Sequence, residues 1–243
     1  NAIAIKSGQK LFLINVLRFL GIERKVIFHA TSSKEREAIL KVYSKAEIKL
    51  VSNLTALSSS EGRTPSGPRF RFLSVGRISA VKNTLELVEM FSKLNELQLT
   101  LVGTEDEKEY YEKCLSVIQT SANVKSVGGR NAEDIKREYQ EADFFISMTS
   151  GENFGHAIIE ALSFGCPVII SDQTPWNDLE ECGAGWVIPL HDTSRWNQVL
   201  NDAIEMSDSD YKKMSENAAA YVKTRFNFEE IRSQYLDLFS AKS

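Results

Sequence analysis

The sequence predicts an α/β fold, with a doubly wound and mostly parallel sheet preceded by an α/β stub from a second domain. Two observations lead to this prediction. From residue 69 onward, short apolar runs typical of buried strands alternate with longer segments of helical periodicity. The chain also has 243 residues, of which 42% are hydrophobic, and this is enough to build a large core.

The first 68 residues predict a smaller α/β segment followed by a linker. Its elements are a helix, a strand, a second helix and a second strand, at 7–20, at 25–31, from Ser32 or Ser33 to Tyr43, and at 47–51. The helix at 7–20 is apolar on most of its surface, so it needs partners on more than one side. Residues 53–68 are rich in Ser, Gly and Pro, which favours a linker or a surface loop.

The pattern after Pro68 is regular. The predicted strands are 69–75, 97–102, 123–127, 143–148, 167–171 and 185–189. The predicted helices are 82–94, 105–120, 131–141, 154–164 and 193–205. Two more amphipathic helices close the chain, one spanning Tyr211 to Val222 and the other Phe228 to Phe239. In sheets of this kind, ligands bind at the carboxyl ends of the strands.

Two carboxylates bracket the turn after the fourth strand of this sheet. Glu152 lies in the Gly-bearing turn, and Glu160 lies eight positions later inside the next helix. At about 1.5 Å rise per residue, their Cα atoms are separated by roughly 12 Å. This is too far for a shared acid/base pair, but it suits two contacts with one long ligand. An ordinary βαβ unit with solvated acids is the alternative.

The run Glu152-Asn153-Phe154-Gly155-His156-Ala157-Ile158-Ile159-Glu160-Ala161 resembles the E-x7-E signature of retaining glycosyltransferases with the GT-B fold, in the broad family 4 group. The usual form, E-G-F-G-x-x-x-x-E-A, is matched at both acids, at the Phe-Gly step and at the final Ala. The sequence departs from it at Asn153, where Gly is commoner, and at His156, where an apolar residue is commoner. The resemblance extends over the order of the predicted elements.

Two cations follow the first strand of the sheet. The segment from Gly76 to Asn83, which contains Arg77 and Lys82, resembles the G-R-x-x-x-x-K-N segment of the same family. A nucleoside diphosphate leaving group gains negative charge as the glycosidic bond breaks. Two cations beside a helix terminus can stabilise that charge without a metal. A pair of ordinary surface cations is the alternative.

The resemblance implies a binding site for a nucleotide diphosphate sugar. Glu160 accepts hydrogen bonds from the two ribose hydroxyls, and Glu152 contacts the sugar ring. Turn glycines after the next two strands let the backbone approach the base or ribose, although they also fit ordinary turns. The residues expected to bind the donor are Gly76, Arg77, Lys82, Gly103, Val127, Gly128, Gly129, Arg130, Glu152, Asn153, Phe154, Gly155, His156 and Glu160. Of these, Arg77, Lys82 and Glu152 are the expected catalytic residues.

Composition and spacing disfavour several other functions. A net charge of −4 gives no electrostatic footprint for nucleic acid, and no apolar run is long enough to span a bilayer. The cysteines show no metal or redox spacing and predict a reducing compartment. Asp172 resembles the acidic residue of nicotinamide-binding folds, but the required G-x-G-x-x-G is absent from the sequence. Asp208-Ser209-Asp210 resembles a metal motif, but helix capping explains it better. We therefore expect no metal and no cofactor apart from the donor substrate.

The resemblance implies a retaining glycosyltransferase of the hexosyltransferase type. It would transfer a sugar from a nucleotide diphosphate sugar to a hydroxyl of a sugar, a glycan or a lipid-linked glycan. Two alternatives stay open. One is an epimerase or phosphorylase on the same fold, and the other is a non-catalytic module that binds nucleotide sugars.

The resemblance also implies a domain organisation. Residues 1–52 would be the tail of a truncated acceptor domain, 53–68 a linker, 69–225 the donor-binding domain and 226–243 a cross-over helix. We therefore expect this chain to bind a nucleotide sugar without transferring it. The apolar helix at 7–20 should either drive self-association or fold back onto the sheet domain.

Two smaller expectations concern the origin and location of the chain. Asn1-Ala2 is interpreted as a scar of tag removal, with a processed natural terminus as the alternative. The expected location is the cytoplasm, with peripheral membrane contact of the full-length protein left open.

Overall fold

The structure, a computed structural model, describes residues 8–31, 33–51, 63 and 67–240. The chain divides into two compact units. One is formed by Asn1–Leu54 with Phe226–Ser243, and the other by Thr55–Arg225. The larger unit contains every residue that the sequence predicts to bind the donor.

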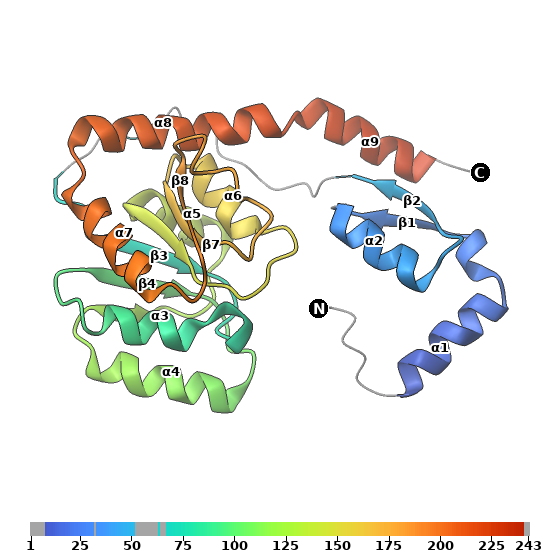
Figure 1. Cartoon of the computed structure of the whole chain (residues 1–243), viewed down its shortest axis with the longest axis horizontal. Helices are drawn as coiled ribbons and strands as arrows, with labels where there is room; N and C mark the ends of the chain where they lie inside the picture. The colour runs from blue at the N-terminus through green and yellow to red at the C-terminus, as the bar shows by residue number, and fades with distance from the viewer. Residues whose placement is uncertain (1–7, 32, 52–62, 64–66, 241–243) are drawn as a thin grey trace. The chain divides into compact units, whose positions relative to one another are not determined.

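The larger unit is built on a six-stranded parallel sheet with the strand order β5-β4-β3-β6-β7-β8 (Figure 1). The strands are β3 Arg71–Val75, β4 Gln98–Val102, β5 Val124–Ser126, β6 Phe144–Ser147, β7 Val168–Ser171 and β8 Gly185–Ile188. The chain runs outward from β3 through β4 to β5, and then crosses to β6 on the other side of β3. This confirms the predicted doubly wound sheet. Its switch point lies between β3 and β6, where ligands bind in such folds.

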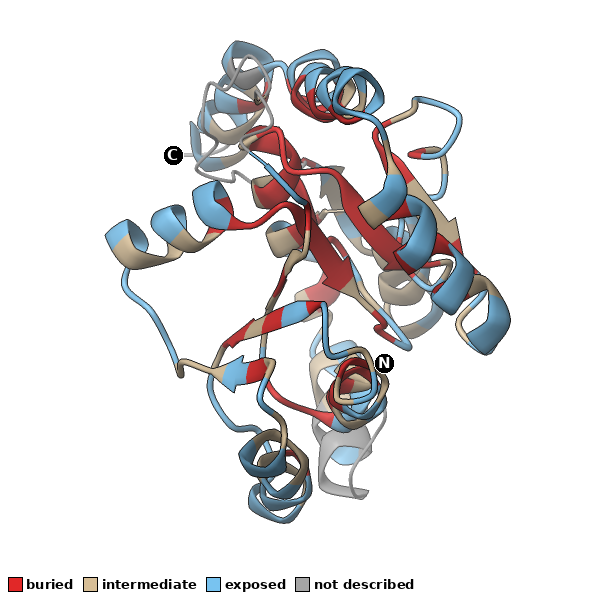
Figure 2. Ribbon diagram, turned by 90° about the vertical axis from the view of Figure 1, so that its left-hand side faces the viewer, coloured by how far each residue is buried: buried red, intermediate tan, exposed pale blue. Residues whose placement is uncertain are grey.

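Helices cover both faces of this sheet. Residues of α3 Thr84–Phe91, α4 Lys108–Thr120 and α7 Thr193–Glu205 share one core cluster with the strands. On the other face, α5 Ala132–Glu141 packs its Tyr139 against β6, and α6 His156–Ser163 packs against α8 Asp208–Arg225. Figure 2 shows strands that are mostly buried, and helices that expose their outer sides.

The core explains why the strands read as unbroken apolar runs. Phe72 of β3 and Phe144 of β6 stack at 5.6 Å in the cluster that contains α3 and α7. The next residue, Phe145, faces the opposite side and lies 6.4 Å from the ring of Tyr139. Because helices cover both faces of the sheet, the residues of a strand are buried whichever face they point to, as is usual for parallel sheets.

Three helices begin two or three residues later than the sequence pattern predicted. Helix α6 begins at His156 and not at 154, because Gly155 has a φ of +82° and cannot continue a helix. Helix α3 begins at Thr84, because Asn83 lies in the left-handed region with φ +47°. Helix α4 begins at Lys108, because Glu105 forms a parallel bridge with Ile78.

The smaller unit contains a two-stranded parallel sheet. Its elements are α1 Gly8–Phe19, a 3₁₀ turn Ile22–Arg24, β1 Ile27–Ala30, α2 Ser33–Val42, β2 Glu47–Leu50 and α9 Phe228–Ser240. The backbone N and Oγ1 of Thr31 donate to Glu35 Oε2 at 2.8 and 2.7 Å, which secures the start of α2. Of the two expected caps, Ser33 is the first residue of α2, and Ser32 lies outside the described residues, as does most of the expected linker at 53–68.

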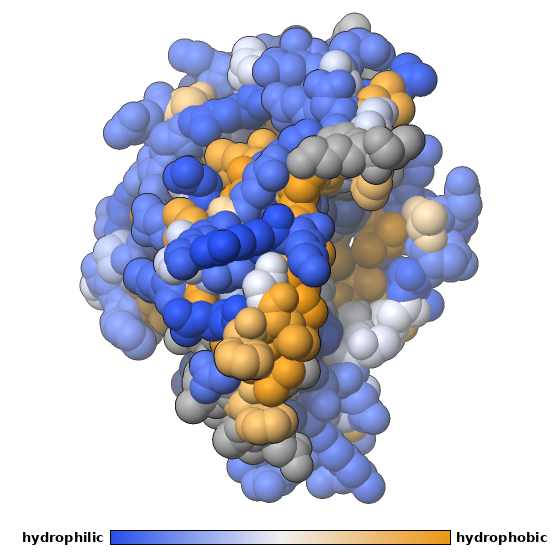
Figure 3. Space-filling model, turned by 90° about the vertical axis from the view of Figure 1, so that its right-hand side faces the viewer, coloured by the Kyte–Doolittle hydropathy of each residue, from blue (hydrophilic) through white to orange (hydrophobic). Residues whose placement is uncertain are grey.

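Apolar side chains lie exposed in the smaller unit. Figure 3 shows apolar side chains gathered within a mostly polar surface. Among the described residues of this unit, the exposed large apolar side chains are Phe12, Phe19, Leu20, Val26, Leu50, Leu236 and Phe239. Phe19, at the end of α1, is 91% exposed. None of the described helices is long and apolar enough to cross a bilayer.

Candidate functional site

The centre of the candidate site is an ion pair at the switch point of the sheet. Lys82 follows β3, Glu152 follows β6, and the Nζ of Lys82 donates to Glu152 Oε2. The other carboxylate oxygen, Oε1, accepts from the backbone N of Asn153 at 3.0 Å. The two side chains are only 26% and 22% exposed. The fold thus joins the predicted phosphate contact and the predicted sugar contact, which lie 70 residues apart in the sequence.

Arg77 lies at the same end of β3 but has a different partner. Its Nη1 donates to Asp106 Oδ1 at 2.8 Å, and its side chain is 67% exposed. The described structure therefore does not join Arg77 to the Lys82–Glu152 pair. Exposed ion pairs contribute about 0–1 kcal/mol, so an anionic ligand can replace Asp106 at little cost.

Gly76, Gly103 and Gly128 follow the ends of β3, β4 and β5, and we call the backbone of these three glycines the ledge. The N–H of Gly76 donates to Val102 O at 2.9 Å, and the N–H of Gly103 donates to Gly128 O at 3.0 Å. A Cβ on Gly103 would lie 1.8 Å from Gly76 O, so only glycine permits this approach. A Cβ on Gly76 would lie 3.7 Å from the Cε of Lys82, which places this lysine beside the ledge.

The segment 127–130, whose turn glycines are expected to let the backbone approach the base or ribose, follows β5. The backbone N of Val127 donates to Leu101 O at 3.0 Å, and Gly128 has a φ of +71°. A Cβ on Gly129 would lie 3.2 Å from Thr104 Cγ2. Arg130 Nε lies 3.8 Å from Glu138 Oε1, which is a loose ion pair. These residues continue the ledge along the carboxyl ends of the strands.

The turn before α6 is fixed by a neighbouring loop. The rings of Phe154 and Trp176 meet edge to face at 5.5 Å, and Trp176 Nε1 donates to Phe154 O. The backbone N of Glu152 donates to Gln173 O at 3.1 Å in the same loop. Phe154 is buried, so its side chain packs in the core of this turn, whereas Asn153 and His156 are exposed. This loop, which contains Gln173, Pro175 and Trp176, therefore supports the acidic motif directly.

Glu160 has a partner that the sequence pattern did not indicate. Its Oε2 accepts a hydrogen bond from the hydroxyl of Tyr139 at 2.9 Å. Asp106, the partner of Arg77, was missed in the same way. A signal for Tyr139 existed, because Ile135 and Tyr139 are the only large apolar residues of a polar helix and are spaced i, i+4. No pattern indicated that its hydroxyl would reach α6.

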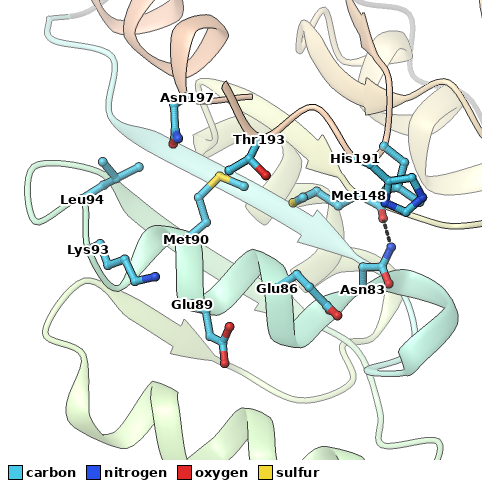
Figure 4. Close-up of a pocket in the computed structure, with 11 residues that line it drawn as sticks. Asn83, Glu86, Glu89, Met90, Lys93, Leu94, Met148, His191, Thr193 and Asn197 are labelled. Atoms are coloured by element: carbon cyan, nitrogen blue, oxygen red, sulfur yellow. Dashed lines mark hydrogen bonds between the residues drawn. The ribbon is translucent and has the colours of Figure 1, made fainter. Parts of the chain in front are cut away.

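A groove lies between α3 and α7, apart from the predicted donor-binding residues, and it is a poor site for a diphosphate (Figure 4). Its volume is about 620 Å³, and Met90 and Met148 supply part of its lining. Glu86 and Glu89 also line it and outnumber the one lysine there, Lys93, so the net negative charge would disfavour phosphate. None of the predicted donor-binding residues lines this groove. At its end, Asn83 Nδ2 donates to Met148 O at 2.9 Å, next to Lys82.

The Asp208-Ser209-Asp210 motif and His29 have structural roles. Helix α8 begins at Asp208, which pairs with Arg69 at 2.7 Å, and Ser207 Oγ accepts from the backbone N of Asp210 at 3.1 Å. The cap is therefore Ser207. His29 Nε2 lies 2.8 Å from Val51 O inside the smaller unit. Across the part of the chain that the structure describes, no group of three or more His, Cys, Asp or Glu side chains could hold a metal ion.

Comparison with known sequences confirms the resemblance. The family described as "Glycosyl transferases group 1" matches residues 57–221. GDP-mannose:cellobiosyl-diphosphopolyprenol alpha-mannosyltransferase of Xanthomonas oryzae pv. oryzae (strain PXO99A) is 23% identical over 215 residues, which are 86% of this chain and 56% of that protein. Lipopolysaccharide core biosynthesis glycosyltransferase LpsE of Rhizobium meliloti (strain 1021) is 23% identical over 205 residues, which are 82% of this chain and 59% of that protein. The chain thus spans less than two thirds of the length of these relatives.

Solved structures share the fold. Anabaena Alr3699/HepE in complex with UDP and glucose matches with a TM-score of 0.75 at 19% identity, over 97% of this chain and 69% of that chain. A mutant of S. aureus TarM in complex with Fondaparinux, alpha-GlcNAc-glycerol and UDP matches with a TM-score of 0.70 at 18% identity, over 88% of this chain and 43% of that chain.

Proposed function

We propose, since this chain belongs to the glycosyl transferases of group 1, that it forms the donor-binding half of a retaining, metal-independent glycosyltransferase. The full protein transfers a hexose from a nucleotide diphosphate sugar to a hydroxyl of a sugar, a glycan or a lipid-linked glycan. Retention of configuration is taken from the resemblance of the segment Glu152–Ala161 to the signature of retaining enzymes. The donor substrate is the only small molecule that the proposal requires.

The observation that carries this proposal is the pairing of Lys82 with Glu152 at the switch point. A lysine ammonium has three N–H donors, so Lys82 can hold Glu152 and a phosphate oxygen at the same time. As the glycosidic bond breaks, its electron pair passes to the diphosphate, and positive charge develops on the sugar. Lys82 then stabilises the leaving group, and the carboxylate of Glu152 lies beside the sugar.

The remaining residues bind the rest of the donor. Arg77 releases Asp106 and contacts the diphosphate, because a diphosphate carries more charge than one carboxylate. Glu160 accepts hydrogen bonds from the ribose hydroxyls. The ledge of Gly76, Gly103 and Gly128 lets the nucleotide approach the backbone.

Two cations take the place of a metal in this proposal. Mg²⁺ is usually held by one or two carboxylates together with substrate phosphates. At the switch point, the carboxylate of Glu152 is already bound by Lys82 and by the N–H of Asn153. Lys82 and Arg77 are the groups left to neutralise the phosphates.

The chain by itself is proposed to bind the donor without transferring the sugar. In two-domain enzymes of this kind, the acceptor binds to the other half, and closure of the two halves excludes water from the reacting bond. The chain spans 56% and 59% of the mannosyltransferase and of LpsE. Sugar transfer by the purified 243-residue chain would contradict this part of the proposal.

Calorimetry with UDP, GDP and ADP, each also as a sugar conjugate, tests the binding. At least one nucleoside diphosphate should bind more tightly than its nucleoside, because Lys82 and Arg77 contact the phosphates. The affinity should be the same in the presence of EDTA. The proposal fails if none of the three binds, or if EDTA abolishes binding.

A further inference from the structure

The hydroxyl of Tyr139 is a buried polar group that donor binding alone does not explain. The side chain lies on α5 and is 1% exposed. Its hydroxyl donates to Glu160 Oε2 at 2.9 Å and lies 3.3 Å from the carbonyl oxygen of Ala157. A buried hydroxyl needs an acceptor, and the backbone carbonyl would meet that need. The shorter contact is nevertheless made to Glu160, the residue that we propose binds the ribose.

The ring of Tyr139 holds this hydroxyl in a fixed place. It stacks on Phe164 with ring centroids 5.5 Å apart and an angle of 12°, and it lies 6.4 Å from the ring of Phe145. Tyrosine has only two side-chain torsions that move the ring, and packing on two aromatic neighbours restricts both. Glutamate has three torsions and is half-buried at position 160. The tyrosine is therefore the rigid member of the pair.

Tyr139 stays a donor at neutral pH. Burial, with a further contribution from the charge of Glu160, raises the pKa of the Tyr139 phenol well above its ordinary value. A protonated phenol donates its hydrogen, so the carboxylate oxygen must act as the acceptor. The direction of the bond is thus fixed as well as its place.

We infer that Tyr139 is a positioning residue for recognition of the ribose diol. By holding Oε2 of Glu160, it sets the orientation of the carboxylate and leaves Oε1 to accept from the ribose hydroxyls. This inference rests on the proposed function. Preorganising an acceptor in this way strengthens the contact with the correct ligand, because less freedom is lost on binding. The site should therefore select ribonucleotides over 2′-deoxyribonucleotides, and Tyr139 should contribute to that selection.

Tyr139→Phe is the variant that tests this role, because it removes one hydroxyl and keeps the stacked ring. Calorimetry would measure UDP beside dUDP, GDP beside dGDP, and ADP beside dADP, on the wild-type chain, Tyr139→Phe, Glu160→Gln and the double variant. Tyr211→Phe is the matched control, since Tyr211 is also buried and its hydroxyl donates to a backbone carbonyl, Asp143 O, at 2.9 Å.

Tyr139→Phe should lower the preference for the bound nucleotide over its 2′-deoxy form about three- to tenfold, whichever of UDP, GDP and ADP binds. Its affinity for the deoxy form should fall less, because only the 3′-hydroxyl remains to contact Glu160, and this retained binding also shows that the variant is folded. In the Glu160→Gln background, the same change should have no further effect. Tyr211→Phe should keep the full preference.

Three results would overturn the inference, and they differ in what they say of the proposed function. If Glu160→Gln loses the preference while Tyr139→Phe keeps it, Tyr139 does not position Glu160 and the proposed function stands. If none of UDP, GDP and ADP binds the wild type, or if Glu160→Gln keeps the preference, the proposed ribose contact fails together with the inference.

Discussion

Lys82 and Glu152 form an ion pair of opposite charges at the switch point. Before a ligand binds, each neutralises the other, so neither charge is buried alone. A diphosphate can join the pair because the ammonium has donors to spare. The pair therefore neutralises its own charge and still offers donors to an anion.

Lys82→Met should weaken binding of the nucleoside diphosphate by about 1.5–3 kcal/mol, the scale of a charge-assisted hydrogen bond. Binding of the nucleoside without phosphates should change little. Lys108→Met on the exposed surface of α4 is the control and should leave both affinities unchanged. Equal losses for nucleoside and diphosphate in calorimetry would place Lys82 away from the phosphates.

Sequence reasoning identified residues of the candidate site better than their partners. Lys82, Glu152 and Glu160 stood out because they follow glycines or occur at a spacing that resembles a family signature. The partners Tyr139 and Asp106 come from neighbouring elements, and only the packing of helices and strands brings them into contact. Their roles, like those of the donor-binding residues, stay predictions until a ligand is bound.

At the scale of elements, the ends of β3, β4 and β5 depend on glycine. Gly103→Ala should lower the free energy of unfolding by about 2–4 kcal/mol, because its Cβ would overlap Gly76 O, a backbone atom. Gly151→Ala is the control, since a Cβ there would meet nothing within 4 Å. Urea unfolding measures both. Equal midpoints for the two variants would show that the ledge is not closely packed.

Arg63 connects the segment before β3 to the helices behind the sheet. Its guanidinium donates to Phe164 O at 2.9 Å, at the end of α6. It also donates to the carbonyl oxygens of Tyr139 and Ala142, at the end of α5. Its backbone N donates to Ser215 Oγ at 2.7 Å. A cation at the C-terminal end of a helix stabilises the carbonyls that lack partners there.

Arg63→Ala should therefore lower the free energy of unfolding by about 2–4 kcal/mol. Arg63→Lys should recover only part of this loss, because an ammonium cannot reproduce the planar fork of a guanidinium. Arg137→Ala serves as the control, since Arg137 is exposed on α5 and pairs with Asp134 at 3.4 Å. A loss as small as that of the control would mean that Arg63 is not an anchor.

The strands of the larger unit were the easiest elements to predict. Phe144-Phe145-Ile146 and Val168-Ile169-Ile170 are unbroken apolar runs, which only a strand buried on both faces explains in this context. Helix starts were harder, because the conformations of Asn83 and Gly155 depend on contacts that local patterns do not record. The anchor at Arg63 lies in a stretch whose composition suggested only a loop.

At the scale of the whole molecule, buried and half-buried thiols and phenols that hold their protons make stability depend on pH. Burial raises the pKa of the Cys114 and Cys166 thiols from 9.0 to about 11, and that of Tyr110 and Tyr221 from 10.0 to about 12. In the unfolded chain the thiols release their protons above about pH 9 and the phenols above about pH 10. The native chain keeps both kinds of proton at these pH values. Because the native state then binds more protons, the stability it has below pH 9 is lost as the pH rises.

The urea concentration at the unfolding midpoint should therefore decrease as the pH rises from about 9 to about 11. Cys114→Ala should show a shallower fall than the wild type, because one of the buried thiols is absent. Cys182→Ala, at an exposed position, should follow the wild-type slope. A midpoint that stays constant over this range would contradict the assigned burial of these groups.

Self-association of the chain through its smaller unit stays a prediction. Phe12 and Phe19 are exposed on α1, and contiguous apolar surface on a protein tends to find a partner. Light scattering at increasing protein concentration measures it directly. A mass that stays that of one chain at all concentrations would count against this prediction.

Binding of the nucleotide at the switch point between β3 and β6 is the central claim for the whole molecule. A crystal structure of the chain with whichever of UDP, GDP or ADP binds in calorimetry tests it most directly. The diphosphate should lie against Lys82 beside Gly76, and the ribose hydroxyls should lie within hydrogen-bond distance of Glu160. A nucleotide bound in the groove between α3 and α7, with Lys82 still paired only to Glu152, would contradict the claim.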